Sequence, residues 1–188
     1  MINAVIRVVY RLYLFCVQIG PLWLLILAAF GSSLGLLLRR RVGRGLVSQR
    51  RALCQWMLWF YLAFILIQTV FSRRVLFGAD APLAERIDLR VFSSWGDKLT
   101  YNIDTRMELA LNLLLLLPVG RLWRPSLQKP FWMLFVFGTL LSLGIESSQL
   151  LLRIGYFEIA DFVENVIGLC IGFGLYLLRE RRLCRKHA

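Results

Sequence analysis

The sequence predicts an all-α membrane protein, a polytopic bundle of about five transmembrane helices. Of its 188 residues, 59% are hydrophobic and the mean hydropathy is +0.65, whereas soluble domains are only about half apolar. The apolar residues gather in runs of about 20, the length that an α-helix needs to cross a bilayer. Lysine and arginine outnumber aspartate and glutamate by 23 to 11. Because these basic residues cluster at the ends of the apolar runs, we expect them to contact anionic lipid headgroups rather than nucleic acid.

Five apolar runs are the predicted spans, and they cover residues 12–38, 53–71, 108–123, 131–152 and 162–178. Gly20-Pro21 either kinks the first run or marks the true start of its helix, because proline lacks a backbone N–H. Pro118 interrupts the third run. Pro130 stands at the first turn of the fourth, where proline is tolerated. The third and fifth runs are short, so we expect neighbouring helices to support them.

The arginines predict the orientation of the bundle, since basic loops face the cytoplasm. With five spans, three basic regions fall on one side: the loop 39–52, the loop after the third run and the tail 179–188. The N-terminus is then outside and the C-terminus cytoplasmic. The chain divides into a two-span region (1–72), an extracytoplasmic loop (73–107), a three-span core (108–178) and a cytoplasmic tail (179–188).

The loop 73–107 is nearly neutral and contains an amphipathic string at residues 87–92. This string predicts either a segment that lies on the membrane surface or a solvated linker. The sequence carries no motif for a metal or another cofactor. Its four cysteines show no CxxC or Cys/His spacing, and its one histidine, His187, lies in the tail. We therefore expect no metal, no cofactor and no histidine-based catalytic site.

Polar residues inside the apolar runs are costly, and ionisable ones mark functional sites by default. On one face of the fourth run, at helical spacing, lie Ser142, Glu146, Gln149 and Arg153. The fifth run repeats this spacing with Asp161, Asn165, Gly168 and Gly172. The third run carries Glu108 and Asn112, one turn apart. Each run thus pairs a carboxylate with a carboxamide near its predicted outer end, and together they predict a polar pocket open to the outside.

Structural roles compete with this interpretation. Thr105 and Glu108 have the spacing of a capping box, and Asp161 suits a helix N-cap. Glu146 lies mid-helix and cannot cap, so its structural alternative is an interhelical contact with Asn112, Asn165 or Arg153. The small residues at the GxxxG-type spacing predict close helix packing, in which Gly168 and Gly172 face Gly138 and Ser142.

The ordered set of these residues resembles the VanZ-like family of bacterial membrane proteins. That family has an Asn and a Pro-Gly-type break in one helix, then Ser-x-x-x-Glu-x-x-Gln, Asp-x-x-Asp and Asn-x-x-Gly-x-x-x-Gly. The matching residues here are Asn112, Pro118, Gly120, Ser142, Glu146, Gln149, Glu158, Asp161, Asn165, Gly168 and Gly172. Glu158 stands where the family usually has the first Asp, which keeps the charge but changes its reach. Residues 87–92 also resemble the loop that precedes the family core.

The name-giving member of the family is associated with resistance to the antibiotic teicoplanin. The resemblance therefore implies a cell-envelope role in the bacterial inner membrane. The leading hypothesis is a protein that binds or handles a membrane lipid or a lipid-linked envelope precursor. Arg153 would anchor a phosphate or carboxylate, and Glu146 and Asp161 would orient Arg153 or take protons. Hydrogen bonds to the headgroup would come from Asn112, Gln149 and Asn165.

Three other functions stay open. Glu146 and Asp161 are also the candidate catalytic residues of an intramembrane acid/base enzyme that acts on a lipid-linked substrate. The sequence favours binding over catalysis, because it offers no evident nucleophile beyond a few serines. Intramembrane carboxylates also suit a proton-coupled transporter or a scramblase. Finally, the polar cluster could hold helices together in a structural subunit of a homo- or hetero-oligomer.

Overall fold

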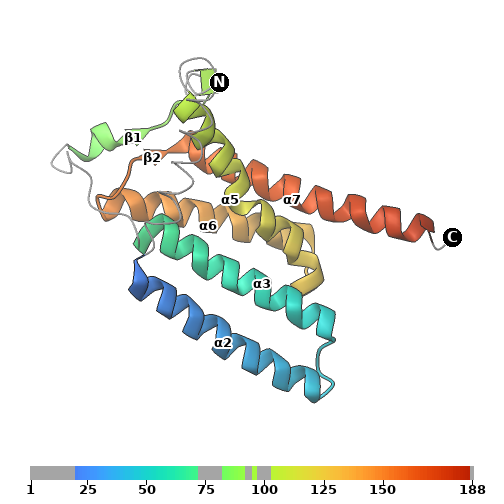
Figure 1. Cartoon of the computed structure of the whole chain (residues 1–188). Coiled ribbons are helices and arrows are strands. Elements are labelled where there is room, and N and C mark those ends of the chain that lie inside the picture. Colours follow the sequence, from blue (N-terminus) through green and yellow to red (C-terminus); the bar gives the residue numbers. More distant parts are fainter. Residues whose placement is uncertain (1–19, 72–81, 92–94, 97–102, 187–188) are drawn as a thin grey trace.

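The computed structural model describes residues 20–71, 82–91, 95–96 and 103–186 (Figure 1). Five long α-helices dominate this part of the chain, which confirms the all-α prediction. They are α2 (Pro21–Gly43), α3 (Gln49–Leu66), α5 (Ile103–Leu127), α6 (Phe131–Leu151) and α7 (Ile159–Lys186). Shorter elements are the π-helical turn η1 (Ile67–Phe71), the 3₁₀ turn η2 (Leu83–Arg86) and the strands β1 (Ile87–Asp88) and β2 (Phe157–Glu158).

Two of the helix starts follow from local sequence. Gly20 is the N-cap residue of α2 and Pro21 is its first helical residue. Gly20-Pro21 therefore marks a helix start rather than a kink, while residues 12–19 lie outside the described part. Ser48 caps α3, since its hydroxyl accepts a hydrogen bond from the backbone N–H of Arg51.

The third and fifth helices are longer than the apolar runs predict. α5 continues through Pro118 and also contains Pro125. The expected interruption at Pro118 is therefore wrong, and membrane helices tolerate proline where neighbours satisfy the freed backbone groups. The carbonyl that loses its helical donor at Pro118 is that of Leu114, and the adjacent carbonyl of Leu115 accepts a hydrogen bond from the hydroxyl of Tyr61 at 3.0 Å. α7 extends through the basic tail to Lys186 (Figure 1).

Four of these helices are long and apolar enough to cross a membrane: Pro21–Gly43, Gln49–Phe71, Phe131–Leu151 and Ile159–Arg185. α5 is not among them, because charged residues stand near both of its ends, including Glu108 and Arg124. The chain is thus a multi-pass membrane protein. The orientation of the bundle stays a prediction.

The closest helix contact is between α5 and α7, and it runs through glycine. A Cβ atom added at any of three glycines would strike a backbone carbonyl of the other helix. The pairs are Gly168 with Leu113, Gly172 with Leu117 and Gly120 with Leu169. Only residues without a side chain allow two helix backbones to approach this closely.

α6 packs on a different face of α7 than the sequence suggests. Gly168 and Gly172 face α5, so the expected pairing of these two glycines with Gly138 and Ser142 is wrong. Gly138 instead lies against the side chain of Leu169. The Ser142 hydroxyl donates to the backbone carbonyl of Phe162 at 3.4 Å.

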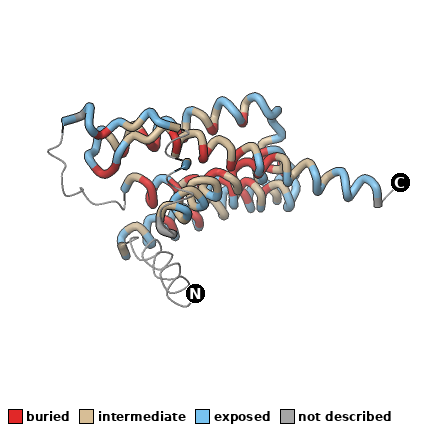
Figure 2. The backbone as a smooth tube through the Cα atoms, turned by 90° about the horizontal axis from the view of Figure 1, so that it is seen from above, coloured by how far each residue is buried: buried red, intermediate tan, exposed pale blue. Residues whose placement is uncertain are grey.

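The hydrophobic core lies where α3, α5, α6 and α7 meet. Its fully buried side chains include Leu58, Ile65, Leu116, Leu134 and Leu169. Figure 2 shows the buried residues gathered where these helices cross, while the C-terminal part of α7 is exposed. α2 packs on α3, and many of its large apolar side chains are exposed, as expected of a helix that faces lipid.

A short parallel ladder joins two loops at one end of the bundle. Ile87 pairs with Phe157, and Asp88 pairs with Glu158. Residues 87–88 are therefore a paired strand, which neither predicted alternative includes, and the position of this string relative to the membrane surface stays a prediction. The backbone pairing fixes the chain before α5 to the loop between α6 and α7, which sequence patterns alone do not reveal.

Alanine at Gly168 should destabilise the protein by about 1–3 kcal/mol, because its Cβ would push α5 and α7 apart. Gly174 lies on the same helix with nothing within 4 Å of its Cβ position. The matched variant Gly174→Ala should therefore be neutral, or more stable by up to about 1 kcal/mol, since alanine favours a helix over glycine. Thermal unfolding of both purified variants beside the parent measures the difference. Equal stabilities of the two variants would contradict the close contact.

Candidate functional site

A cavity of about 420 Å³ opens where the end of α3, the start of α5, the end of α6 and the start of α7 meet. We call it the acidic cavity. Its lining includes the hydroxyl-bearing residues Tyr61, Thr69 and Tyr156. Its other polar lining residues are Glu108, Asn112, Glu146, Gln149, Glu158, Asp161 and Asn165. Residues from three separate predicted helix faces therefore meet around one space.

Five of the six predicted binding residues lie at this cavity, namely Asn112, Glu146, Gln149, Asp161 and Asn165. The sixth, Arg153, lies outside it. Arg153 is exposed and has φ of 58°, and it follows the last turn of α6, where its backbone N–H donates to the carbonyl of Leu150. A left-handed residue after a helix is a common way to end it.

The capping interpretations of Glu108 and Asp161 do not apply. α5 begins at Ile103, so Thr105 and Glu108 lie inside the helix instead of flanking it. α7 begins at Ile159, which places Asp161 within its first turn and past the N-cap position. Both carboxylates line the acidic cavity, and Asp161 also lies at the positive end of the helix dipole.

Hydrogen bonds hold several polar side chains of α6 in place. Glu146 is only 3% exposed, and its carboxylate accepts the backbone N–H of Glu158 at 3.4 Å. The amide of Gln149 donates to the carbonyl of Thr69 in the π-helical turn at 3.2 Å. Asn165 of α7 donates to the hydroxyl of Ser142 at 3.1 Å. These contacts join α6 to β2 and α7, which follow it in the sequence, and to η1, which lies far from it in the sequence.

The π-helical turn η1 contributes a backbone acceptor to this wall. The hydroxyl of Thr69 donates to the carbonyl of Ile65 at 2.8 Å, which satisfies a carbonyl near the end of α3. The Thr69 carbonyl in turn accepts from Gln149. Short π-helical segments are rare and occur frequently at functional sites. The sequence offers no pattern that would predict this turn.

Glu164 is a central residue that the sequence interpretation missed. It is fully buried in α7, and its two carboxylate oxygens accept hydrogen bonds from Trp95 Nε1 at 3.0 Å and Asn112 Nδ2 at 2.9 Å. The Asn112 side chain is therefore held in place by a buried carboxylate of the neighbouring helix. The missed signal was the charge itself, because a carboxylate within an apolar run needs a partner.

Arg86 is a second residue that the sequence did not single out. It is 5% exposed, and its Nη2 donates to the carbonyls of Leu150 at 3.0 Å and Gly155 at 2.9 Å. Arg86 thus adds a donor to carbonyls at and just beyond the end of α6, a region where helix carbonyls lack full pairing within the helix. Because Gly155 lines the acidic cavity, Arg86 supports the rim. No local pattern separates Arg86 from the other arginines.

The lining of the acidic cavity carries several negatively charged groups. Its four carboxylates are those of Glu108, Glu146, Glu158 and Asp161, and its described lining residues include no lysine or arginine. Carboxylates could also bind a metal ion. However, the described residues contain no group of three or more His, Cys, Asp or Glu side chains placed to hold one.

Apolar side chains form the rest of the lining, including Phe64, Leu111, Ile145 and Ile154. Leu114 of α5 lines the cavity and is 55% exposed on the outside of the bundle. Tyr156, in the loop between α6 and α7, also lines the cavity and is half exposed. The cavity therefore reaches both an apolar helix face and the polar end of the bundle.

Replacing Arg86 with methionine should lower stability by about 1–3 kcal/mol, because it removes the buried donor that the carbonyls of Leu150 and Gly155 share. Arg90, four residues later, forms an exposed ion pair with Asp88 and is 71% exposed. Arg90→Met should cost less than about 1 kcal/mol. Thermal unfolding of the two variants tests this contrast, and a larger loss in Arg90→Met would refute the role given to Arg86.

Comparison with known proteins agrees with the sequence resemblance. A family model described as VanZ/LLP1 matches residues 57–180, which is more than half of the chain. Neither a curated protein nor a solved structure shows significant similarity. The matched stretch extends from within α3 to within α7 and contains every lining residue of the acidic cavity. The chain is therefore a member of the VanZ/LLP1 family.

Proposed function

We propose that this membrane protein binds the polar headgroup of an envelope lipid, or of a lipid-linked precursor, in the acidic cavity. One observation carries the proposal: a single cavity combines carboxylates and carboxamides with an apolar wall that reaches the outside of the bundle at Leu114. A polar pocket beside an exposed apolar helix face suits an amphiphile, whose headgroup needs hydrogen bonds and whose chain needs hydrocarbon.

The lining favours a headgroup that donates hydrogen bonds. A carboxylate offers about four acceptor sites, so each one can serve a ligand as well as its protein partners. Hydroxyl and amine groups are the matching donors, as in a sugar or an amino-bearing headgroup. The carboxamides of Gln149 and Asn165 can both donate and accept.

A bare phosphate is disfavoured inside this cavity, because four carboxylates would repel it. A phosphate on the same amphiphile would remain outside. Arg153 follows the last turn of α6 and is exposed, so it would meet such a phosphate beyond the rim. This arrangement keeps the proposed anchoring role of Arg153 without placing its charge in the pocket.

Native mass spectrometry of the gently purified protein tests the proposal. Glu108→Gln combined with Asp161→Asn removes two charges from the cavity and keeps the size of each side chain. We expect the parent to retain one class of amphiphile and the double variant to retain about tenfold less of it, as for lost charge-assisted hydrogen bonds. Glu85→Gln is the control, because Glu85 is exposed and does not line the cavity.

If the parent retains no specific amphiphile and the double variant instead unfolds at lower temperature, the carboxylates serve as helix contacts and the binding proposal fails.

Acid–base catalysis on a lipid-linked substrate is the second candidate function. The observation that favours it is the contrast between two carboxylates of one cavity, since Glu146 is 3% exposed and Glu108 is exposed. Carboxyl groups in different surroundings can take separate acid and base roles. Glu146→Gln keeps a side-chain oxygen that can accept the N–H of Glu158. Conversion of a bound lipid by the parent but not by this variant would favour an enzyme.

A further inference from the structure

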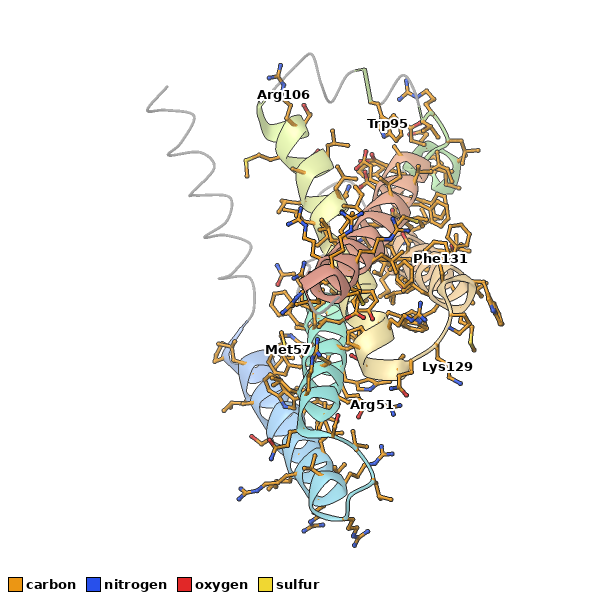
Figure 3. The ribbon with its side chains drawn as sticks, turned by 90° about the vertical axis from the view of Figure 1, so that its right-hand side faces the viewer. Arg51, Met57, Trp95, Arg106, Lys129 and Phe131 are labelled. Carbon is orange, nitrogen blue, oxygen red and sulfur yellow. The ribbon has the colours of Figure 1, made fainter. Side chains whose placement is uncertain are left out.

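A second cavity of about 450 Å³ lies at the opposite end of the same helices. The acidic cavity is lined by residues from the end of α3 and the starts of α5 and α7. The second cavity is lined by residues from the start of α3, the end of α5 and a later part of α7. Its lining residues are Ser48, Arg50, Arg51, Arg124, Pro125, Gln128, Tyr176 and Glu180. Figure 3 shows Trp95 and Arg106 toward one end of the bundle and Arg51 and Lys129 toward the other.

The charge of this arginine cavity is opposite to that of the acidic cavity. Arg50, Arg51 and Arg124 line it, and Glu180 is the one carboxylate among its described lining residues. A net positive lining attracts anions. Basic pockets between helices at a membrane interface bind the headgroups of anionic lipids.

Arg51 is held in position by the protein. Its backbone N–H donates to the Ser48 hydroxyl at 3.4 Å, and its Nε donates to the carbonyl of Ser126 at 3.1 Å. The Ser126 carbonyl also accepts from Gln55 Nε2 at 3.1 Å, and Ser126 is fully buried. The Nε contact uses one of five guanidinium N–H donors. A fixed guanidinium loses little conformational entropy when it binds a ligand.

We propose that the arginine cavity binds a phosphate group, carried by an anionic phospholipid or present as free phosphate. Guanidinium groups match the oxygens of phosphate with paired, charge-assisted hydrogen bonds. Three arginines from two helices converge on a space large enough for such a group. This site is separate from the acidic cavity and does not rest on the function proposed for it.

The test uses the full chain with Arg50→Gln and Arg124→Gln combined. Arg51 is kept, because its contact with Ser126 joins α3 to α5. The matched control is Arg41→Gln with Arg121→Gln, which removes two exposed arginines that do not line the cavity. Native mass spectrometry measures retained phosphatidylglycerol against phosphatidylcholine. Thermal unfolding in inorganic phosphate, against chloride at equal ionic strength, measures free phosphate.

We expect the cavity variant to retain about tenfold less phosphatidylglycerol than the parent, and the control to match the parent. If inorganic phosphate stabilises the parent and the control variant but not the cavity variant, the site is supported with free phosphate as its ligand. The proposal is overturned if the parent prefers neither phosphatidylglycerol nor phosphate. It is also overturned if the control variant loses as much binding as the cavity variant, since the loss of two positive charges anywhere on the protein would then explain the effect.

Discussion

The backbone contact between α5 and α7 positions the polar side chains and the two cavities of this bundle. Gly120, Gly168 and Gly172 let the two helices approach until their carbonyls lie where side chains would otherwise be. This approach brings Asn112 of α5 to the buried carboxylate of Glu164 in α7 at 2.9 Å. A buried charge is expensive without partners, so close packing and polar pairing support one another. The same two helices then supply one wall of the acidic cavity and one wall of the arginine cavity.

Helical periodicity predicted much of the bundle. The described parts of all five apolar runs are helical except at the end residues Gly20 and Leu152, and one family covers the stretch that holds the polar motifs. Side chains spaced by one or two turns, such as Glu146 with Gln149 and Asp161 with Asn165, do line one cavity. The prediction worked because residues at this spacing share a helix face whatever the tertiary structure, and polar groups in an apolar run must point away from lipid.

The roles of several buried residues could not be predicted from the sequence, because these roles depend on contacts between distant segments. Arg86 is one arginine among many until the end of α6 lies against it, and Glu164 needs Trp95 and Asn112 to explain its burial. The glycines were recognised as packing residues, but spacing alone does not say which helix they face. The capping pattern predicted the wrong role for Glu108. A four-residue motif does not show that the helix already begins before it, as α5 does at Ile103.

Site-specific photocrosslinking tests whether the acidic cavity holds a particular amphiphile. Tyr156 lines the cavity and is half exposed, so benzoylphenylalanine there should react with its occupant. Trp132, exposed at the start of α6 and outside the cavity, is the matched position. We predict adducts at Tyr156 that are enriched in one headgroup class, and adducts at Trp132 that follow the bulk lipid composition. The same bulk composition at both positions would contradict the account.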